Sequence, residues 1–441
     1  MRHSRFSVSQ LAARNLATPA RKQKIALPRR KHAPQRRNPA QRRKNALLRR
    51  RIAPQIKNAR RRPKTSNALI SQKTPKENFW RLFNFMKTLI LSGIAFAFLS
   101  ACAYSYFQFP DILVKNRIFA FVFAALSLSF PIYFFMRKLD VPSFALQGLF
   151  TVSTAWIGFI FYFSLISLFF GFLDILRVKI PYAFFAAFAA TIAILIFGFI
   201  KNRNFEIREY NLKIEKPMDF PVKIAAASDL HLGYGSSKEK IEKMARAINA
   251  QKPDAILIAG DLIDDNVNIL DKRKISEILK GLNAPMGVFA VFGNHEYLAG
   301  EKESEEFYKA SNIKLLKGKI AMLENGLQIA GLDDFSNKKT QRENEIAKLL
   351  NRKLPSILLD HQPHNLQNKA NLGFDIQISG HTHSGQIFPL NLITKLLFEI
   401  DCGYKKINSC HCFVSSGISL WGPPFRIGTK NEFLVLNISN K

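Results

Sequence analysis

Four stretches in the N-terminal half of the chain contain no charged residue: 88–109, 118–136, 141–173 and 180–200. About 20 consecutive apolar residues suffice to cross the hydrocarbon core of a bilayer, so the first, second and fourth stretches each predict one membrane-spanning helix. The third is long for one span and too short for two, so we expect it to tilt or to end in an interfacial turn. The pattern predicts an all-α transmembrane region of about four helices over residues 86–200.

The positive charge of the chain is concentrated at its N-terminus. Residues 1–76 hold 24 basic and no acidic side chains, residues 77–204 hold 10 and 4, and residues 205–441 hold 31 and 28. The C-terminal half is therefore nearly neutral, which argues against a dedicated nucleic-acid enzyme, because such enzymes carry a basic surface. We expect membrane lipids as partners and no specific nucleic acid.

The basic tail, residues 1–76, has few apolar side chains and is predicted to be disordered. Three interpretations stay open. The tail binds anionic lipid head groups, it binds nucleic acid nonspecifically, or translation begins at Met86 and the tail does not exist. With a start at Met86, the segment 99–102 resembles a lipoprotein signal with Cys102 as the lipidated residue. We favour the simpler interpretation, in which these are ordinary residues of a membrane helix.

Five short segments in the C-terminal half carry side chains that bind hard metal ions such as Mn, Fe, Zn or Mg. Each follows an apolar, largely β-branched stretch (222–227, 255–258, 288–292, 357–359 and 376–378), which predicts a strand with its ligands on the following loop. Outer helices are expected over 238–250, 272–282 and 341–350, and a polar linker over 201–220. The predicted ligands are Asp229, His231, Asp261, Asn294, His361, His381 and His383.

These segments resemble the calcineurin-like metallophosphoesterase superfamily over residues 221–441. The stretches 380–389, 415–417 and 421–426 are similar to its bacterial membrane-associated phosphodiesterase branch, apart from Ser384, where this branch often has glycine. The resemblance implies an α/β domain of two mixed β-sheets packed face to face with helices outside. It also implies two divalent metal ions. Asp229, His231 and His383 would hold one, Asn294, His361 and His381 the other, and Asp261 would bridge them.

Such a ligand set suits phosphate ester hydrolysis. Two divalent ions roughly 3.5–4 Å apart lower the pKa of a bridging water and clamp the phosphoryl group. His295 is the candidate general acid for the leaving alkoxide, and Asp264 matches the family's partner for that histidine, although the adjacent Asp265 could compete. Arg426 is a candidate phosphate clamp, because guanidinium binds phosphate in bidentate fashion. The alternative is that it anchors the loop after Pro423-Pro424.

Three cysteines, Cys402, Cys410 and Cys412, surround His411. Their spacing could seat a zinc ion. Unpaired buried thiols, or one disulfide if the domain faces outward, are the favoured alternatives.

Together, these patterns predict an enzyme of the inner or plasma membrane that crosses it several times. The predicted activity is that of a phosphodiesterase or pyrophosphatase, and the phosphoester substrate is expected to be amphiphilic. The alternatives are a phosphomonoesterase or protein phosphatase of the same superfamily, and a non-catalytic scaffold that binds lipid or nucleic acid through its tail. A basic tail is expected to stay in the cytoplasm. Four membrane crossings would bring the chain back to that side, so we expect a cytoplasmic catalytic domain. If the third stretch fails to span, the domain faces outward.

Overall fold

The computed structural model describes residues 96–137, 139, 141–264, 266–337 and 343–440. The basic tail, Met86, Asp265 and the start of the first apolar stretch lie outside the described residues. From that stretch the structure describes an apolar helix, Phe96–Phe107, which is followed by the short helix α3 (Asp111–Val114).

Three helices are long and apolar enough to cross a membrane: α4 (Arg117–Met136), α5 (Ser143–Ile175) and α6 (Ala183–Asn202). They coincide with the second, third and fourth uncharged stretches. Helix α4 begins where the Asn116 side chain accepts hydrogen bonds from the amides of Ile118 and Phe119, which satisfies two donors of its first turn. Aromatic side chains such as Phe159 and Phe163 fill the space between these helices.

The third stretch forms one unbroken helix, α5, whose 33 residues are about 50 Å long at 1.5 Å per residue. This exceeds the roughly 30 Å of a hydrocarbon core. The N-terminal end of α5 packs on the C-terminal domain. Gln147 Oε1 accepts a hydrogen bond from Arg273 Nη2 at 2.6 Å, and Leu146 and Phe150 share a buried cluster with Tyr234.

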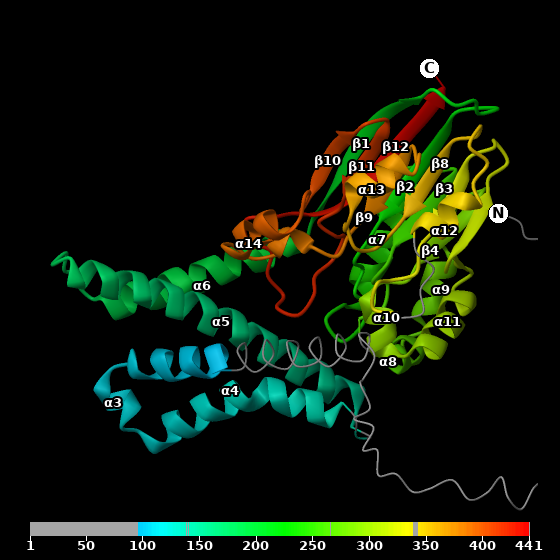
Figure 1. The fold of residues 1–441 in the computed structure, drawn as a ribbon. Coiled ribbons are helices and arrows are strands. Elements are labelled where there is room, and N and C mark those ends of the chain that lie inside the picture. The colour runs from blue at the N-terminus through cyan, green and yellow to red at the C-terminus, as the bar shows by residue number, and fades with distance from the viewer. Residues whose placement is uncertain (1–95, 138, 140, 265, 338–342, 441) are drawn as a thin grey trace, which may run out of the picture. The chain divides into compact units, whose positions relative to one another are not determined.

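The catalytic domain contains two mixed six-stranded sheets (Figure 1). The strand order is β1-β12-β2-β3-β4-β5 in the first sheet and β10-β11-β9-β8-β7-β6 in the second. In the first sheet β12 is antiparallel to β2, and in the second the β10–β11 and β6–β7 pairs are antiparallel; all other pairs are parallel. The strands of the first sheet are β1 (Phe205–Ile214), β2 (Val222–Ala227), β3 (Ala255–Ala259), β4 (Gly287–Val291), β5 (Lys314–Leu315) and β12 (Asn431–Asn440). Those of the second are β6 (Lys319–Met322), β7 (Gln328–Gly331), β8 (Ser356–Leu359), β9 (Ile376–Ser379), β10 (Gly403–Ile407) and β11 (Cys410–Val414).

The two sheets pack face to face through a core of buried aliphatic side chains from both, for example Ile224 and Leu257 against Ile329 and Ile378. Helices cover the outer faces, as the sequence predicts for this α/β sandwich. On the first sheet they are α7 (Lys238–Ala250), α8 (Val267–Lys272), α9 (Ile275–Lys280) and α11 (Glu301–Ala310). On the second sheet they are α12 (Glu343–Lys348) and α13 (Leu366–Asn371).

Two local predictions are wrong. The expected linker 201–220 contains β1, which pairs in parallel with β12 at the edge of the first sheet. Only one side of this edge strand is buried, so its exposed charged residues make the segment resemble a linker. The helix expected over 272–282 is divided between α8 and α9, because Lys274 adopts a left-handed conformation (φ 54°) that ends one helix and begins the other.

Candidate metal centre

All five predicted ligand segments follow a strand at its carboxyl end. Strands β2, β3 and β4 are parallel neighbours in the first sheet, and β8 and β9 are parallel neighbours in the second. Carboxyl ends of parallel strands meet at one edge of a sheet, so the loops from both sheets converge at one rim. The remaining ligand, His383, begins a single 3₁₀ turn, His383–Gly385, two residues after His381.

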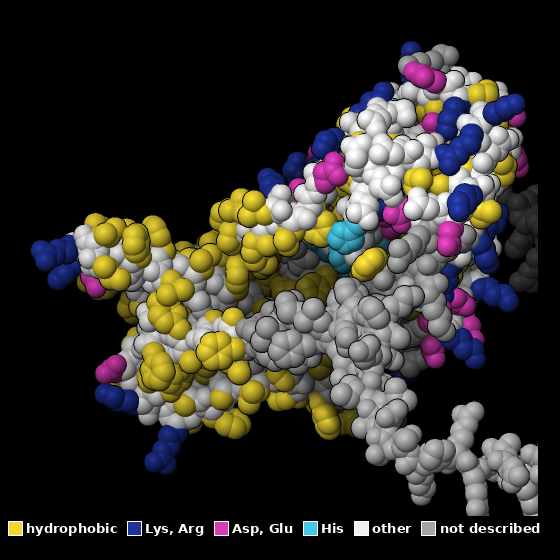
Figure 2. All heavy atoms as spheres, viewed as in Figure 1, with side chains coloured by type: hydrophobic (Ala, Val, Ile, Leu, Met, Phe, Trp, Pro, Cys, Tyr) yellow, Lys and Arg dark blue, Asp and Glu magenta, His cyan; other side chains and the backbone are white. Residues whose placement is uncertain are grey.

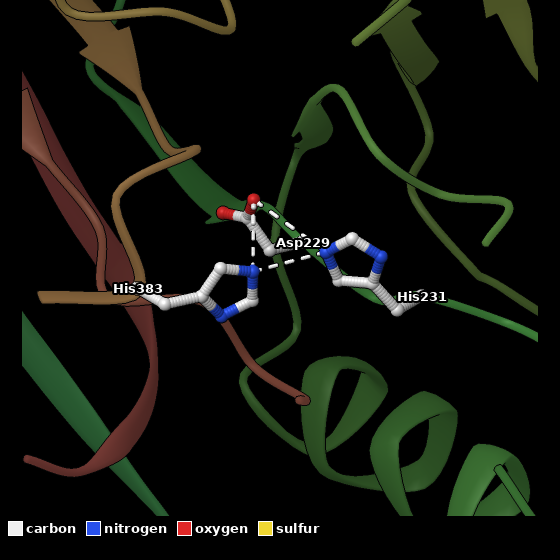
Figure 3. A group of neighbouring side chains, drawn as sticks. All are labelled: Asp229, His231 and His383. Atoms are coloured by element: carbon white, nitrogen blue, oxygen red, sulfur yellow. Dashed lines mark hydrogen bonds and ion pairs between the residues drawn. The ribbon is translucent and has the colours of Figure 1, made fainter. Parts of the chain in front are cut away.

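The first cluster consists of Asp229, His231 and His383, whose side chains point toward one another (Figure 3). The Nε2 atoms of His231 and His383 are 3.0 Å apart. Asp229 Oδ1 lies 3.6 Å from His383 Nε2 and 4.0 Å from His231 Nε2. All three residues are buried. Burial, together with the neighbouring His231 and Arg426, lowers the pKa of His383 well below its usual value, so its ring is neutral, the form that binds a metal.

The second cluster consists of Asp261, His361 and His381. His361 Nε2 lies 3.2 Å from Asp261 Oδ2 and 3.2 Å from His381 Nδ1. The other nitrogen of His361, Nδ1, lies 2.9 Å from the carbonyl of Ala259, which holds the ring with Nε2 toward the cluster. Burial and the neighbouring His361 lower the pKa of His381 to about 3, which leaves that ring neutral.

Asn294, the first residue of helix α10 (Asn294–Ala299), supplies a further sign of a cation site. Its Oδ1 atom is buried and has no hydrogen-bond partner among the described residues. A buried oxygen left without a partner costs about 1–3 kcal/mol, a cost that a cation at this position would remove. The donor set of carboxylate, imidazole and amide oxygen therefore fits hard divalent ions.

Backbone strain is concentrated in the same loops. Five of the seven predicted ligands adopt a left-handed conformation with φ between 43° and 73°. Residues other than glycine rarely adopt this conformation, and such strain persists where the surrounding structure enforces it, often at functional sites. The five are Asp229, His231, Asp261, His381 and His383.

Two glycines allow the loops to approach the carboxylates. A Cβ atom on Gly293 would lie 2.1 Å from Asp261 Oδ1, and one on Gly380 would lie 2.2 Å from Asp229 Oδ2. Any side chain would displace these carboxylates, so both positions require glycine.

His295 and Asp264, the predicted general acid and its partner, lie together at the rim. His295 Nδ1 is 3.2 Å from Asp264 Oδ1 and 2.7 Å from the Asp264 carbonyl, and the same Oδ1 lies 3.3 Å from Nδ1 of the ligand His231. Burial alone would lower the pKa of His295. The bond to Asp264 and the charges of Asp261 and Asp264 outweigh burial and raise it to about 9, which keeps the ring protonated near neutral pH.

Arg426, the candidate phosphate clamp, is fully buried. Its guanidinium donates to the carbonyls of His383, Ser416 and Ser419 at 2.8, 2.7 and 3.0 Å, and to the Asn431 side chain at 2.7 Å. These contacts leave no exposed guanidinium edge for a phosphate. The geometry therefore contradicts the clamp and supports the loop anchor.

Glu296 has a positioning role that the sequence analysis did not assign. Its buried carboxylate accepts hydrogen bonds from the amides of Gly293, Ile263 and Asp261 at 2.6, 2.9 and 3.2 Å. It thereby joins the loop after β3 to the loop after β4. The signal was present, because a glutamate directly follows Asn294-His295, but only the fold shows which amides it meets.

The cysteine segment forms no comparable cluster. Cys402, Cys410 and Cys412 are free thiols, and Cys410 and Cys412 are buried residues of strand β11 in the second sheet. His411 instead contacts the hydroxyl of Tyr404 at 2.9 Å. The described residues therefore support unpaired thiols over a zinc site.

The fold and these clusters define the class of a metal-dependent phosphoric ester hydrolase. Comparison with known proteins agrees, since the family model described as calcineurin-like phosphoesterase matches residues 222–385. An uncharacterized metallophosphoesterase of Aquifex aeolicus is 33% identical over 260 residues, covering 57% of this chain and 98% of its own length. This chain belongs to the calcineurin-like phosphoesterase family.

The chain is also similar to a membrane protein by sequence and to a solved structure by fold. A Danio rerio protein named transmembrane protein with metallophosphoesterase domain is 30% identical over 227 residues, which cover 48% of this chain and 52% of that protein. The match thus spans about half of the Danio rerio relative. The crystal structure of a 5'-nucleotidase precursor from Thermus thermophilus is 14% identical with a TM-score of 0.32, covering 49% of this chain and 55% of that one.

Proposed function

We propose that this chain is a membrane-anchored phosphodiesterase or pyrophosphatase that works with two divalent metal ions. The observation that carries the proposal is the position of Asp261 between the two clusters. Its Oδ2 atom lies 3.2 Å from His361 Nε2 of its own cluster and 3.7 Å from His231 Nε2 of the first cluster, which supports a bridging role for this carboxylate. Two ions that share a carboxylate are the arrangement used for in-line displacement at phosphorus.

The ligands would divide between the ions along the lines of the two clusters, with Asn294 added to the second. When bound, Mn, Fe, Zn or Mg would activate water as a nucleophile and neutralise charge on the phosphoryl oxygens. Asn294 adds a neutral ligand, which keeps the site more electropositive than another carboxylate would. One ion would be held by Asp229, His231 and His383, the other by Asn294, His361 and His381, and both by Asp261.

His295 acts in this proposal as the general acid. Asp264 engages Nδ1, which leaves Nε2 as the ring nitrogen that can give its proton to the leaving alkoxide. Because Asp264 also contacts the ligand His231, it positions the acid and one metal cluster together.

The substrate class follows from charge and membrane proximity. The catalytic half is nearly neutral, with 31 basic and 28 acidic side chains, which argues against nucleic acid as the substrate. Candidate membrane spans pack directly on it, as the Gln147–Arg273 hydrogen bond illustrates. A phospholipid or a lipid-linked diphosphate, with its phosphate at the bilayer surface, is therefore the proposed substrate.

The proposed location is the inner or plasma membrane, crossed several times, with the catalytic domain in the cytoplasm. The candidate spans α4, α5 and α6 support the membrane location. The cytoplasmic orientation requires the first apolar stretch, of which the structure describes only Phe96–Phe107, to cross as a fourth span. Fusion of a periplasm-active and a cytoplasm-active reporter after Asn440 decides the orientation. Activity of the periplasmic reporter alone would place the domain outside.

The test of activity is hydrolysis of bis(4-nitrophenyl) phosphate by the detergent-solubilised full chain, with Mn²⁺ and after chelation. The proposal requires turnover that needs metal and exceeds turnover of 4-nitrophenyl phosphate. Preference for the monoester would favour a phosphomonoesterase or protein phosphatase instead. If the purified chain holds no metal and hydrolyses neither ester, a non-catalytic scaffold becomes the better explanation.

A further inference from the structure

Helix α14 (Leu390–Leu397) presents an apolar surface that the described part of the chain leaves uncovered. None of its eight residues is buried. Leu392 and Ile393 are each 51% exposed, Leu396 is 86% exposed and Leu397 is 72% exposed. These four positions recur with the spacing of one helix face, whereas the side chain of Thr394 turns inward to hydrogen-bond with Asp401. A contiguous apolar face of this kind marks an interaction surface.

The segment just before α14 is hydrogen-bonded to the candidate membrane span α5. The Tyr162 hydroxyl on α5 donates a hydrogen bond to the carbonyl of Phe388 at 2.7 Å. Ile387 and Leu390 pack in the same apolar cluster as Phe163 of α5. Figure 1 locates α14 by its label, and Figure 2 shows hydrophobic side chains gathered over the helical region.

The depth of this contact can be placed along α5. Gly158, four residues before Tyr162, lies where the catalytic domain meets the helices, because a Cβ there would be 2.6 Å from Phe425. Four residues advance about 6 Å along a helix. The α14 attachment is therefore about 6 Å further along α5 than the Gly158 contact, and further from the N-terminal end of α5, where Gln147 contacts the domain. Amphipathic helices that lie in a membrane interface bury only their apolar face.

We infer that α14 lies in the head-group region of the same membrane that α4–α6 cross, with Leu392, Leu396 and Leu397 against lipid. Lipid is the proposed occupant because the apolar surface of the spans is itself exposed, for example at Ile196 and Phe197 of α6. Because α14 is attached to α5, lipid that surrounds the spans would also lie against α14. The exposed Trp421, 6.1 Å from the His295 ring, is a second side chain typical of that region.

Helix α14 also touches the metal loops, which gives the membrane contact a role in substrate entry. Ser384, next to the ligand His383, and Thr394 of α14 both donate to Asp401 Oδ2 at 3.1 Å. Phe398, which caps α14, lies 6.3 Å from the ring of the ligand His381. A phosphoester could thus reach the metals while its hydrocarbon chain stays in the bilayer. This part of the inference rests on the proposed function.

Membrane contact is tested by fluorescence in vesicles of phosphatidylethanolamine and phosphatidylglycerol. The full chain carries bimane on Leu396→Cys or, as a control, on Met322→Cys, which is 55% exposed on β6 of the second sheet. The unsubstituted chain gives the labelling background of its native thiols. The bimane on Leu396→Cys is expected to be quenched several-fold more by nitroxide-labelled lipid than the control, and to lose quenching by iodide.

Two results would overturn the membrane contact. Iodide quenching at Leu396→Cys equal to the control would mean that α14 faces water. Protection from iodide without quenching by the lipid nitroxide would mean that protein, such as a second copy, covers the helix.

Substrate entry is tested with two matched diesters, ethyl 4-nitrophenyl phosphate in solution and hexadecyl 4-nitrophenyl phosphate in the vesicles. The wild type should prefer the hexadecyl ester. The double variant Leu396→Asp/Leu397→Asp should lose that preference and keep turnover of the ethyl ester, because both side chains are exposed. Equal use of the two esters by the wild type would reject substrate entry. Hydrolysis of neither ester would reject the proposed function, and the quenching result would still decide the position of α14.

Discussion

The Tyr162 hydroxyl donates a hydrogen bond to the carbonyl of Phe388, and through this bond a candidate membrane span holds the chain five residues after the predicted ligand His383. The loop is held from its other side as well, because buried Arg426 donates to the His383 carbonyl. The position of one metal cluster therefore depends on contacts to the helical region. Changes outside the ligand set are expected to reach the chemistry along this route.

Replacement of the shared carboxylate should abolish the metal centre. In Asp261→Asn the negative charge that faces both clusters is removed, while the size of the side chain is kept. Loss of groups that merely support a metal ligand costs about 10–100-fold, so loss of this ligand should reduce turnover by at least roughly 100-fold. Metal content measured on the purified variant should fall with activity. Full metal content together with full activity would contradict the bridging role.

Removal of the proposed acid should slow turnover without loss of metal. His295→Ala is expected to lower kcat about 10²–10⁴-fold, the usual contribution of a positioned acid. The matched control is His411→Ala, because this histidine lies on β11 and contacts Tyr404 rather than the metal clusters. The proposed role fails if both variants have the same rate, or if His295→Ala loses its metal.

The pH dependence should report the pairing of His295 with Asp264. The carboxylate raises the pKa of His295 to about 9, so the acid form persists at neutral pH and is lost as the pH rises through that value. Asp264→Asn removes this charge and lowers the pKa, so the alkaline limb of the kcat profile should move to lower pH. Metal content is followed in parallel, since Asp264 also contacts His231. An unmoved alkaline limb would assign the titration to another group.

Replacement of Arg426 distinguishes a role as loop anchor from a role in binding the phosphate of the substrate. Arg426→Ala leaves the carbonyls of His383, Ser416 and Ser419 without their buried donor, at about 1–3 kcal/mol for each unpaired group. We expect a clearly lower Tm in detergent and an unchanged KM for the remaining active fraction. A raised KM with an unchanged Tm would restore the phosphate clamp.

Much of the local structure could be predicted from residue patterns. The strand before Asp229 and helix α7 have the predicted bounds, 222–227 and 238–250, because continuous apolar runs and helical periodicity are strong signals. Strand β1 was missed, because an edge strand with one exposed side lacks such a run. The break at Lys274 was missed for a different reason, since a single left-handed residue leaves the surrounding helical pattern intact.

In the candidate site, too, some features could be predicted from residue patterns and others could not. Ligand types at successive strand ends predict a cation site, because carboxylate and imidazole donors in that order have few other uses. The distances between clusters come from two sheets that pack through a shared core, which no local pattern encodes. Arg426 illustrates the difference. Its residue type suggested a phosphate contact, whereas its burial among loop carbonyls makes it a structural group.

The sequence by itself determined the apolar stretches long enough to cross a membrane, the near-neutral catalytic half and the candidate metal-binding side chains. These properties depend on composition and on short-range order along the chain. Only the tertiary structure decided that Asp261 of one cluster also lies near His231 of the other, that the N-terminal end of α5 packs on the domain, and that α14 lies beside the loops of the candidate metal centre. Such relationships join residues far apart in sequence, and they arise from the packing of the two sheets and the helices.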